Sequence, residues 1–264
     1  MLIDIGVNLT NKRFDKDRDE LLYRAKDQGV EKLIITGTSV AESQKAIALC
    51  QDYQQKYPNT LYSTAGVHPH DADGVDNDYL MQLALLAEKL HVKAIGECGL
   101  DFNRNFSAPE QQLKVFKAQI SLAAELNMPL FLHQRDAFSP WFAELKPFID
   151  KVPAMISHCF TGNKAELEQC LAANMYIGIT GWLCDERRGK ELQEIVKLIP
   201  LNRLLIETDA PYLTPRTIRP RPKSSRNEPS FLPYVVQKIA ELTAIDPNEI
   251  ACQTSANANQ VFNL

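Results

Sequence analysis

The chain has 264 residues, 45% of them hydrophobic, and a net charge of −4, so it can bury the core of one large α/β domain and is not a polycation that coats nucleic acid. The six cysteines form no C-x-x-C pair, which favours free thiols in a reducing compartment over disulfides or a zinc–thiolate site. We expect a cytoplasmic protein without a signal peptide, because the first apolar run contains Asp4 and no basic segment precedes it. We expect no membrane contact, because no stretch approaches the length of about 18 apolar residues that a membrane span needs.

Short apolar runs recur eight times along the chain. Each run is too short for a helix, is rich in Ile, Leu and Val, and ends at a polar residue or glycine, as the buried strands of a parallel sheet do. In chain order they are Leu2–Val7, Lys32–Thr36, Leu61–Val67, Ala94–Glu97, Pro129–His133, Ala154–His158, Tyr176–Thr180 and Leu204–Asp209.

The segments between these runs have helical periodicity. In Pro109–Asn127 the apolar residues follow the i, i+3, i+4 spacing of an amphipathic helix, and Ser107 and Glu110 have the spacing of a capping box. Strand and helix alternate eight times without a linker or a shift in composition. This pattern predicts a single α/β domain over residues 1–264 with the architecture of a (β/α)8 TIM barrel; a doubly wound open sheet is the alternative.

A long proline-rich segment follows the eighth run. Residues 211–233, which we call the lip, are too long for an ordinary strand-to-helix loop and carry five basic residues before the first acid, Glu228. The five are Arg216, Arg219, Arg221, Lys223 and Arg226. Two extra helices should close the chain, over Phe231–Thr243 and Pro247–Phe262, and Asp246 should cap the second.

Four of the apolar runs end in side chains that bind divalent metals. Glu97 ends the fourth run ahead of a predicted glycine turn, His133 and His158 end the fifth and sixth, and Asp209 ends the eighth. Because the C-terminal ends of the strands of a parallel barrel meet on one face, these side chains should converge there. Two carboxylates and two imidazoles predict a metal site that favours Mg²⁺ or Mn²⁺ over Zn²⁺.

The eighth run also suggests a proton acceptor. Strand alternation places Glu207 and Asp209 on the same side of the strand, with Asp209 nearer its end. We interpret Asp209 as the base that takes the proton of an attacking water, with contact to the metal left open. Glu207 either holds a neighbouring residue in place or forms a buried ion pair.

Other residues near strand ends are candidates for binding substrate. We expect His68, in Gly66-Val67-His68-Pro69-His70, to contact a substrate phosphate, with an ordinary loop histidine as the alternative. Arg135, two residues after His133, can steady an anion. Trp182 is a candidate for stacking on bases, against simple packing at the rim of the barrel.

With these residues identified, the chain resembles the TatD family of metal-dependent deoxyribonucleases, within the amidohydrolase-like barrel superfamily. The resemblance runs nearly end to end and rests on six motifs in register, at residues 66–70, 96–101, 133–137, 157–162, 207–213 and 257–262. It implies a Mg²⁺-dependent 3′→5′ exonuclease that acts on single-stranded DNA, with RNA as a further substrate. It also implies that Glu97, His133 and His158 are metal ligands and that Asp209 is catalytic or a further ligand, so Glu97 and Asp209 are the residues expected to carry catalysis.

One departure from the family pattern concerns the number of metals. Many relatives carry a His-x-His pair at the first strand end, which supplies two more metal ligands. Here those positions are occupied by Gly6 and Asn8. The resemblance therefore implies a second metal position that is short of ligands and fills only when a substrate phosphate is present.

Three functions compete on this sequence. The leading hypothesis is a monomeric nuclease whose lip binds the backbone of single-stranded DNA or RNA through Arg219 and Arg221, in DNA repair or turnover. A barrel hydrolase of small amides or lactones would share the metal site but needs no basic lip. The absence of the His-x-His pair at the first strand end would also fit a non-enzymatic interaction protein with a degenerate barrel.

Overall fold

The computed structural model describes all 264 residues, Met1–Leu264. The chain divides into two compact units. The first comprises Met1–Ile34, Cys159–Ala172 and Tyr176–Leu264, and the second comprises Ile35–His158 and Ala173–Met175. The single domain expected over residues 1–264 stays a prediction.

Eight strands alternate with helices along the chain and follow one another in the sheet in the order β1 to β8. The pairs β3–β4, β4–β5, β5–β6 and β7–β8 are parallel, and Val7 at the end of β1 forms a parallel bridge with Ala210 after β8. This order is that of a (β/α)8 TIM barrel, which confirms the predicted fold class. The strands are β1 (Leu2–Val7), β2 (Val30–Ile35), β3 (Leu61–Ala65), β4 (Val92–Asp101), β5 (Leu130–Arg135), β6 (Met155–Ser157), β7 (Tyr176–Ile179) and β8 (Leu204–Ile206).

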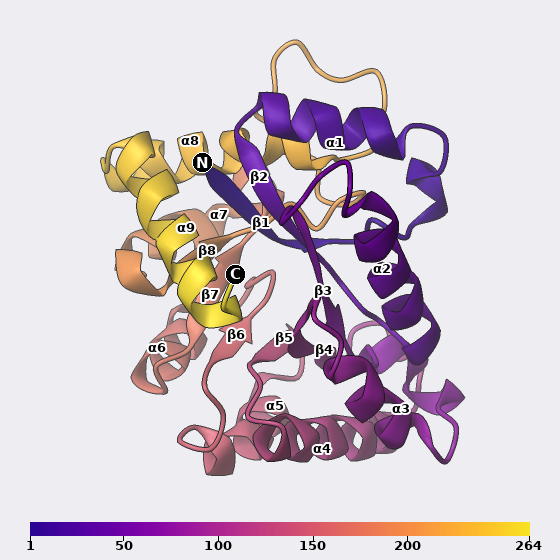
Figure 1. Cartoon of the computed structure of the whole chain (residues 1–264). Coiled ribbons are helices and arrows are strands. Elements are labelled where there is room, and N and C mark those ends of the chain that lie inside the picture. Colours follow the sequence, from indigo (N-terminus) through magenta and orange to yellow (C-terminus); the bar gives the residue numbers. More distant parts are fainter. The chain divides into compact units, whose positions relative to one another are not determined.

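The α-helices include the two that were expected at the C-terminal end. Asp246 accepts a hydrogen bond from the N–H of Asn248 and so caps α9, which packs against β1 and β8 within the first unit (Figure 1). No helix is both long and apolar enough to span a membrane. The helices are α1 (Arg18–Asp27), α2 (Val40–Tyr53), α3 (Tyr79–Ala87), α4 (Pro109–Glu125), α5 (Phe138–Leu145), α6 (Lys164–Ala172), α7 (Lys190–Ile195), α8 (Leu232–Thr243) and α9 (Pro247–Phe262).

Strand β4 is longer than its apolar run, so the turn expected directly after Glu97 is wrong. The strand continues to Asp101, and Gly99 pairs with His133 on β5. A Cβ at Gly99 would lie 1.8 Å from the backbone oxygen of His133, and its φ of 153° disfavours other residues. Glycine therefore permits a close approach of β4 to β5 at this point instead of ending the strand.

The capping box expected at Ser107 and Glu110 is also wrong. Ala108 is the N-cap residue of α4, and the hydroxyl of Ser107 instead accepts the N–H of Asp73 and donates to the carbonyl of His70. The N–H of Ala108 is satisfied by the Asp73 carboxylate. A tertiary contact has replaced the local one, and it ties the start of α4 to the loop that follows β3.

In the first unit, ion pairs anchor the lip to α1. The guanidinium of Arg226 lies 2.7 Å from each carboxylate oxygen of Asp17, and Arg24 on α1 pairs with both Asp17 and Glu228. Arg226 is thus held by acids of the protein, whereas Arg219, Arg221 and Lys223 form no ion pair. Its side chain is only 20% exposed.

Candidate functional site

The second unit gathers four of the predicted site residues into one group, which we call the metal cluster: His68, Glu97, His133 and His158. Glu97 lies within β4 and His133 within β5, while His68 follows β3 and His158 follows β6. The N–H of His158 donates to the carbonyl of Leu132 on β5, which fixes it beside the neighbouring strand. The consecutive strands β3 to β6 therefore bring the four side chains together, Glu97 and His133 from within their strands and His68 and His158 from just after theirs.

One oxygen of Glu97 lies at the centre of this group. Its Oε1 is 2.8 Å from Nδ1 of His133 and 3.4 Å from Nε2 of His68. Nε2 of His158 is 3.5 Å from the same oxygen. Glu97 is 5% exposed, so a buried carboxylate faces three imidazoles.

Asp101 and His70 extend the cluster and were not predicted as site residues. Oδ2 of Asp101 lies 2.7 Å from Nε2 of His70 and 3.6 Å from Nε2 of His133. His133 therefore stands between two carboxylates, those of Glu97 and Asp101. The sequence contained a signal for Asp101, because residues four apart in one strand point to the same side. The turn predicted at Gly99 was wrong, so Glu97 and Asp101 were not assigned to one strand.

Two buried glutamines of α4 fix the backbone on which the cluster is built. The Gln119 amide accepts the N–H of Val67 and donates to its carbonyl, one residue before His68. The Gln112 amide does the same for Asp101. The two glutamines are seven residues apart, so they lie on one face of α4, and both are 1% exposed or less.

The charges of the cluster shift the pKa values of its members. Burial alone would raise the pKa of Glu97, but the imidazoles of His68, His158 and His133 outweigh it and hold that pKa well below its usual value. Burial lowers the pKa of His68 to about 4, which leaves its ring neutral at pH 7. Burial would also lower the pKa of His133, but Asp101 and Glu97 outweigh it and raise that pKa. The surroundings of His133 thus favour positive charge.

The donor set fits a divalent cation. One donor atom from each of His68, Glu97 and His133 lies within 4.8 Å of the others. Nε2 of His133 is buried without a hydrogen-bond partner, as an atom kept for a ligand would be. Mixed imidazole and carboxylate donors suit several divalent metals, so the chemistry of the set does not by itself select one. His68, expected to contact substrate, belongs to this donor group.

Asp209 lies in the first unit, in a short hydrogen-bonded segment after β8. Strand β8 ends at Ile206, and Asp209 has a φ of 53°, so the argument from strand alternation with Glu207 does not hold. Its Oδ1 accepts a hydrogen bond of 2.9 Å from the Asn8 amide. The Glu207 carboxylate accepts the N–H of Cys159 at 2.6 Å and so holds a neighbouring residue in place.

A buried carboxyl supports the backbone next to Asp209. Asp4 accepts hydrogen bonds from the N–H and the hydroxyl of Thr208, and it is fully buried in β1. Burial raises its pKa to about 7, although these hydrogen bonds act in the opposite direction. This link between β1 and the end of β8 fixes the residue that precedes Asp209.

The three arginines predicted to bind substrate form no hydrogen bond with the side chains of the metal cluster. Arg135 ends β5 and is half-buried, opposite Asp101 in the β4–β5 register. Arg219 and Arg221 are exposed in the lip, and Arg219 donates to the backbone carbonyls of Arg216 and Ile218. Arg221 makes no such bond, so its guanidinium is available to a ligand.

Comparison with known proteins agrees with this description along the whole chain. A family model described as "TatD related DNase" matches residues 3–263. A protein from Erwinia tasmaniensis named "3'-5' ssDNA/RNA exonuclease TatD" is 54% identical over 263 residues, and the match covers 100% of both chains. A protein of the same name from Pectobacterium carotovorum subsp. carotovorum is 52% identical over 263 residues with the same coverage.

Solved structures share the fold. A TatD family hydrolase from Entamoeba histolytica superimposes with a TM-score of 0.91 at 30% identity, covering 99% of this chain and 97% of that one. A TatD homologue from Escherichia coli k12 gives a TM-score of 0.89 at 28% identity, covering 100% and 98% of the two chains. The barrel assignment therefore rests on strand order and on whole-chain similarity together.

Proposed function

Because this chain belongs to the family of TatD related DNases, we propose that it is a metal-dependent exonuclease that hydrolyses single-stranded DNA and RNA from the 3′ end. The observation that carries the proposal is the buried group of His68, Glu97 and His133, whose donor atoms lie within 4.8 Å of one another. Relatives more than half identical over the full length are named as 3'-5' ssDNA/RNA exonucleases, which supports the substrate and the polarity.

Glu97, His133, His158 and His68 would hold the metal, with Asp209 as a further ligand or as the base, and Mg²⁺ or Mn²⁺ is favoured over Zn²⁺. When bound, the cation lowers the pKa of a water molecule and stabilises the negative charge that develops on the phosphate. The tie between Gln119 and Val67 keeps the His68 ring in place, and the pair of Glu97 and Asp101 holds His133 from both sides.

Asp209 is the group proposed to accept the proton of the attacking water. The Asn8 amide donates to its Oδ1, which sets the direction of the carboxylate. In this chain Asn8 therefore has an orienting role at the position where many relatives carry a histidine ligand. Arg135 would neutralise a phosphate oxygen of the substrate.

Hydrolysis of a labelled strand tests the proposal. Metal-free protein is incubated with a 5′-labelled single strand, a 3′-labelled strand and a blunt duplex, each with added Mg²⁺, Mn²⁺ or Zn²⁺. We expect stepwise shortening of the 5′-labelled strand, immediate release of label from the 3′ end, and slower attack on the duplex. Hydrolysis of amide or lactone substrates with no action on nucleic acid would replace the proposal with the small-molecule hydrolase. We further propose that the protein acts as a cytoplasmic monomer in DNA repair or turnover.

A further inference from the structure

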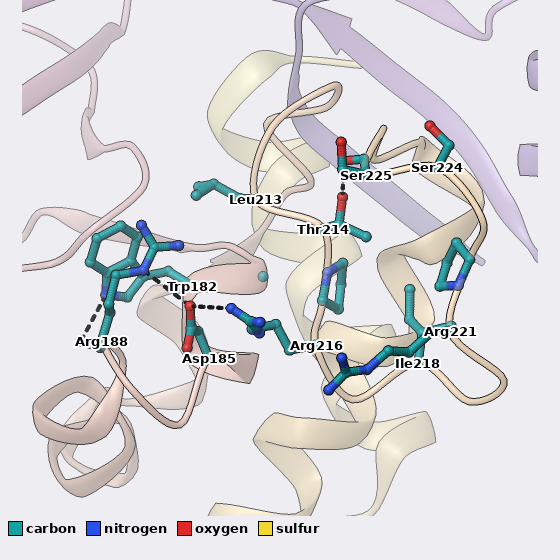
Figure 2. A pocket seen from close by; sticks show the side chains of 13 residues that line it. Trp182, Asp185, Arg188, Leu213, Thr214, Arg216, Ile218, Arg221, Ser224 and Ser225 are labelled. Carbon is teal, nitrogen blue, oxygen red and sulfur yellow. Dashed lines mark hydrogen bonds and ion pairs between the residues drawn. The ribbon is translucent and has the colours of Figure 1, made fainter.

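A pocket of about 360 Å³ lies between the segment that follows β7 and the lip, within the first unit (Figure 2). The two segments touch at Gly181, where a Cβ would lie 2.0 Å from the carbonyl oxygen of Leu213. The volume is at the small end of the range for ligand sites and suits one compact ligand. No residue of the metal cluster lines this lip pocket, so the proposed hydrolysis leaves it without a role.

The lip pocket carries an excess of positive charge. Arg188 and Arg216 both approach Oδ2 of Asp185, at 3.0 Å and 3.6 Å (Figure 2). Arg187, which does not line the pocket, adds a third guanidinium to the same carboxylate at 3.2 Å. Asp185 is buried, whereas the arginines are exposed. Arg221 lines the pocket and pairs with no acid. One carboxylate cannot neutralise these cations, so the lip pocket favours an anion although the chain as a whole is acidic.

The same pocket contains a flat surface on which a ring can stack. The guanidinium carbon of Arg188 lies 4.3 Å from the centre of the Trp182 ring, and the indole N–H donates to the backbone carbonyl of Arg188. Asp185 accepts from Nε of Arg188 and thereby keeps the guanidinium over the indole. Bases of single-stranded nucleic acid stack on aromatic rings and on arginine planes without regard to sequence.

We propose that the lip pocket is a subsite for one nucleotide of the bound single strand, whose base stacks on Trp182 and Arg188 and whose phosphate is bound by Arg216 and Arg221. This rests on the proposed exonuclease function and assigns it a strand contact made by residues outside the metal cluster. A bare phosphate would not use the indole, and an uncharged ring would not use the arginines. A nucleotide is the ligand that uses both.

Tryptophan fluorescence provides a direct test on the full-length protein in EDTA, where hydrolysis is stopped. The chain has two tryptophans, and Trp141 is fully buried, so quenching by a ligand reports on Trp182. We expect an octathymidylate strand to quench the emission and thymidine monophosphate to do so only at concentrations at least about tenfold higher. Trp182→Phe should abolish the quenching and, because one stacked base is lost or weakened, reduce affinity by about fivefold or more.

The charge contribution is tested with Arg221→Ser and a matched control, Lys197→Ser. Both replace one exposed cation of the first unit, but only Arg221 lines the lip pocket. Arg221→Ser should weaken octathymidylate binding and lower the slope of log K against log salt by about 0.7, the value for one phosphate contact. Lys197→Ser should leave the slope unchanged, and both variants should melt like the wild type.

Equal affinity and equal salt slopes in wild type, Arg221→Ser and Lys197→Ser would overturn the proposal. Quenching by thymidine monophosphate as tight as that by the strand would overturn it as well, because the lip pocket would then be a site for free nucleotides. Hydrolysis of labelled strands by the metal-loaded wild type is measured separately. If the wild type hydrolyses the strands while the pocket variants bind like the wild type, the subsite is refuted and the exonuclease function stands. If hydrolysis is absent while the strand still quenches Trp182, the exonuclease function is refuted and the binding subsite stands.

Discussion

In the metal cluster the charged atoms are buried, and a strand or a glutamine of α4 fixes each of them. In the lip pocket, by contrast, Arg188 and Arg216, with side chains 52% and 42% exposed, share the buried carboxylate of Asp185. The cluster holds one carboxylate and three imidazoles, and burial keeps the His68 ring neutral at pH 7. The lip pocket has unbalanced positive charge and an aromatic surface. A rigid, desolvated set of donors suits catalysis, and a solvent-exposed cationic surface suits the binding of a polyanion.

The contrast predicts its largest effect for the cluster. His133→Ala removes the imidazole held between Glu97 and Asp101 and should lower single-strand hydrolysis by at least about 10²-fold, since a catalytic metal contributes several kcal/mol to the rate. The rate is measured on an end-labelled strand with saturating metal. His91→Ala, just before β4, serves as the control and should retain the activity. EDTA-insensitive hydrolysis near the wild-type rate in His133→Ala would refute the assignment.

A second prediction separates the base from the metal ligands. Asp209→Asn keeps the shape of the side chain and can still bond Asn8 after an amide rotation, so the fold should survive. Turnover should fall about 10²- to 10⁴-fold, the usual contribution of a positioned base, while metal affinity changes little. Calorimetric metal titration beside a rate measurement tests this. Loss of metal binding would make Asp209 chiefly a ligand, and unchanged turnover would remove it from the mechanism.

The third prediction concerns the support of the cluster. Gln119→Leu leaves the N–H and the carbonyl of Val67 without their partner in a buried site, which should cost about 1–3 kcal/mol of stability. Activity should drop by about tenfold because His68 loses its fixed backbone. Chemical denaturation and the strand assay measure the two effects. Gln169→Leu, exposed on α6, is the control, and equal behaviour of the two variants would show that α4 does not position the site.

The smallest effect distinguishes two arginines of the lip. Arg226→Leu should lower the free energy of unfolding by about 1 kcal/mol at pH 7 and barely change strand affinity, the opposite of the expectation for Arg221→Ser. The hydrogen bonds of Arg226 lower the pKa of Asp17 to about 2, so this stability is complete above the ordinary pKa near 4 and is lost as pH falls toward 2. Urea denaturation of wild type and variant at several pH values follows the difference. A difference that persists unchanged at pH 2 would show that the ion pair is not its source.

Whether a feature could be predicted from the sequence depends on how far apart in the chain its interacting residues are. Asp246 caps α9 through a residue two positions away, and the positions of His133 and His158 near the ends of β5 and β6 follow from apolar runs that are local signals. Ser107 was mispredicted because its partner, Asp73, is 34 residues distant, and Arg226 pairs with Asp17 across 209 residues. Such pairs depend on the finished fold.

The errors near the site have the same origin. Glycine is typical of turns, but the close approach of β5 sets the backbone conformation of Gly99. Because the strand continues through Gly99, Asp101 reaches the cluster. His68 was predicted from its loop as a substrate contact, and only its distance to Glu97 placed it among the donors. Gln112 and Gln119 were visible as polar residues seven apart within an apolar helix face, a signal that a search for buried polar side chains would have found.

Calorimetric titration of Mn²⁺ into metal-free protein shows whether the cluster around Glu97 is the metal-binding site. Glu97→Gln is nearly isosteric and removes only the negative charge that faces His68, His133 and His158. We expect saturable binding to the wild type and to Lys197→Ser, and an affinity at least about tenfold weaker in Glu97→Gln. The same affinity and stoichiometry in Glu97→Gln as in the wild type would contradict it.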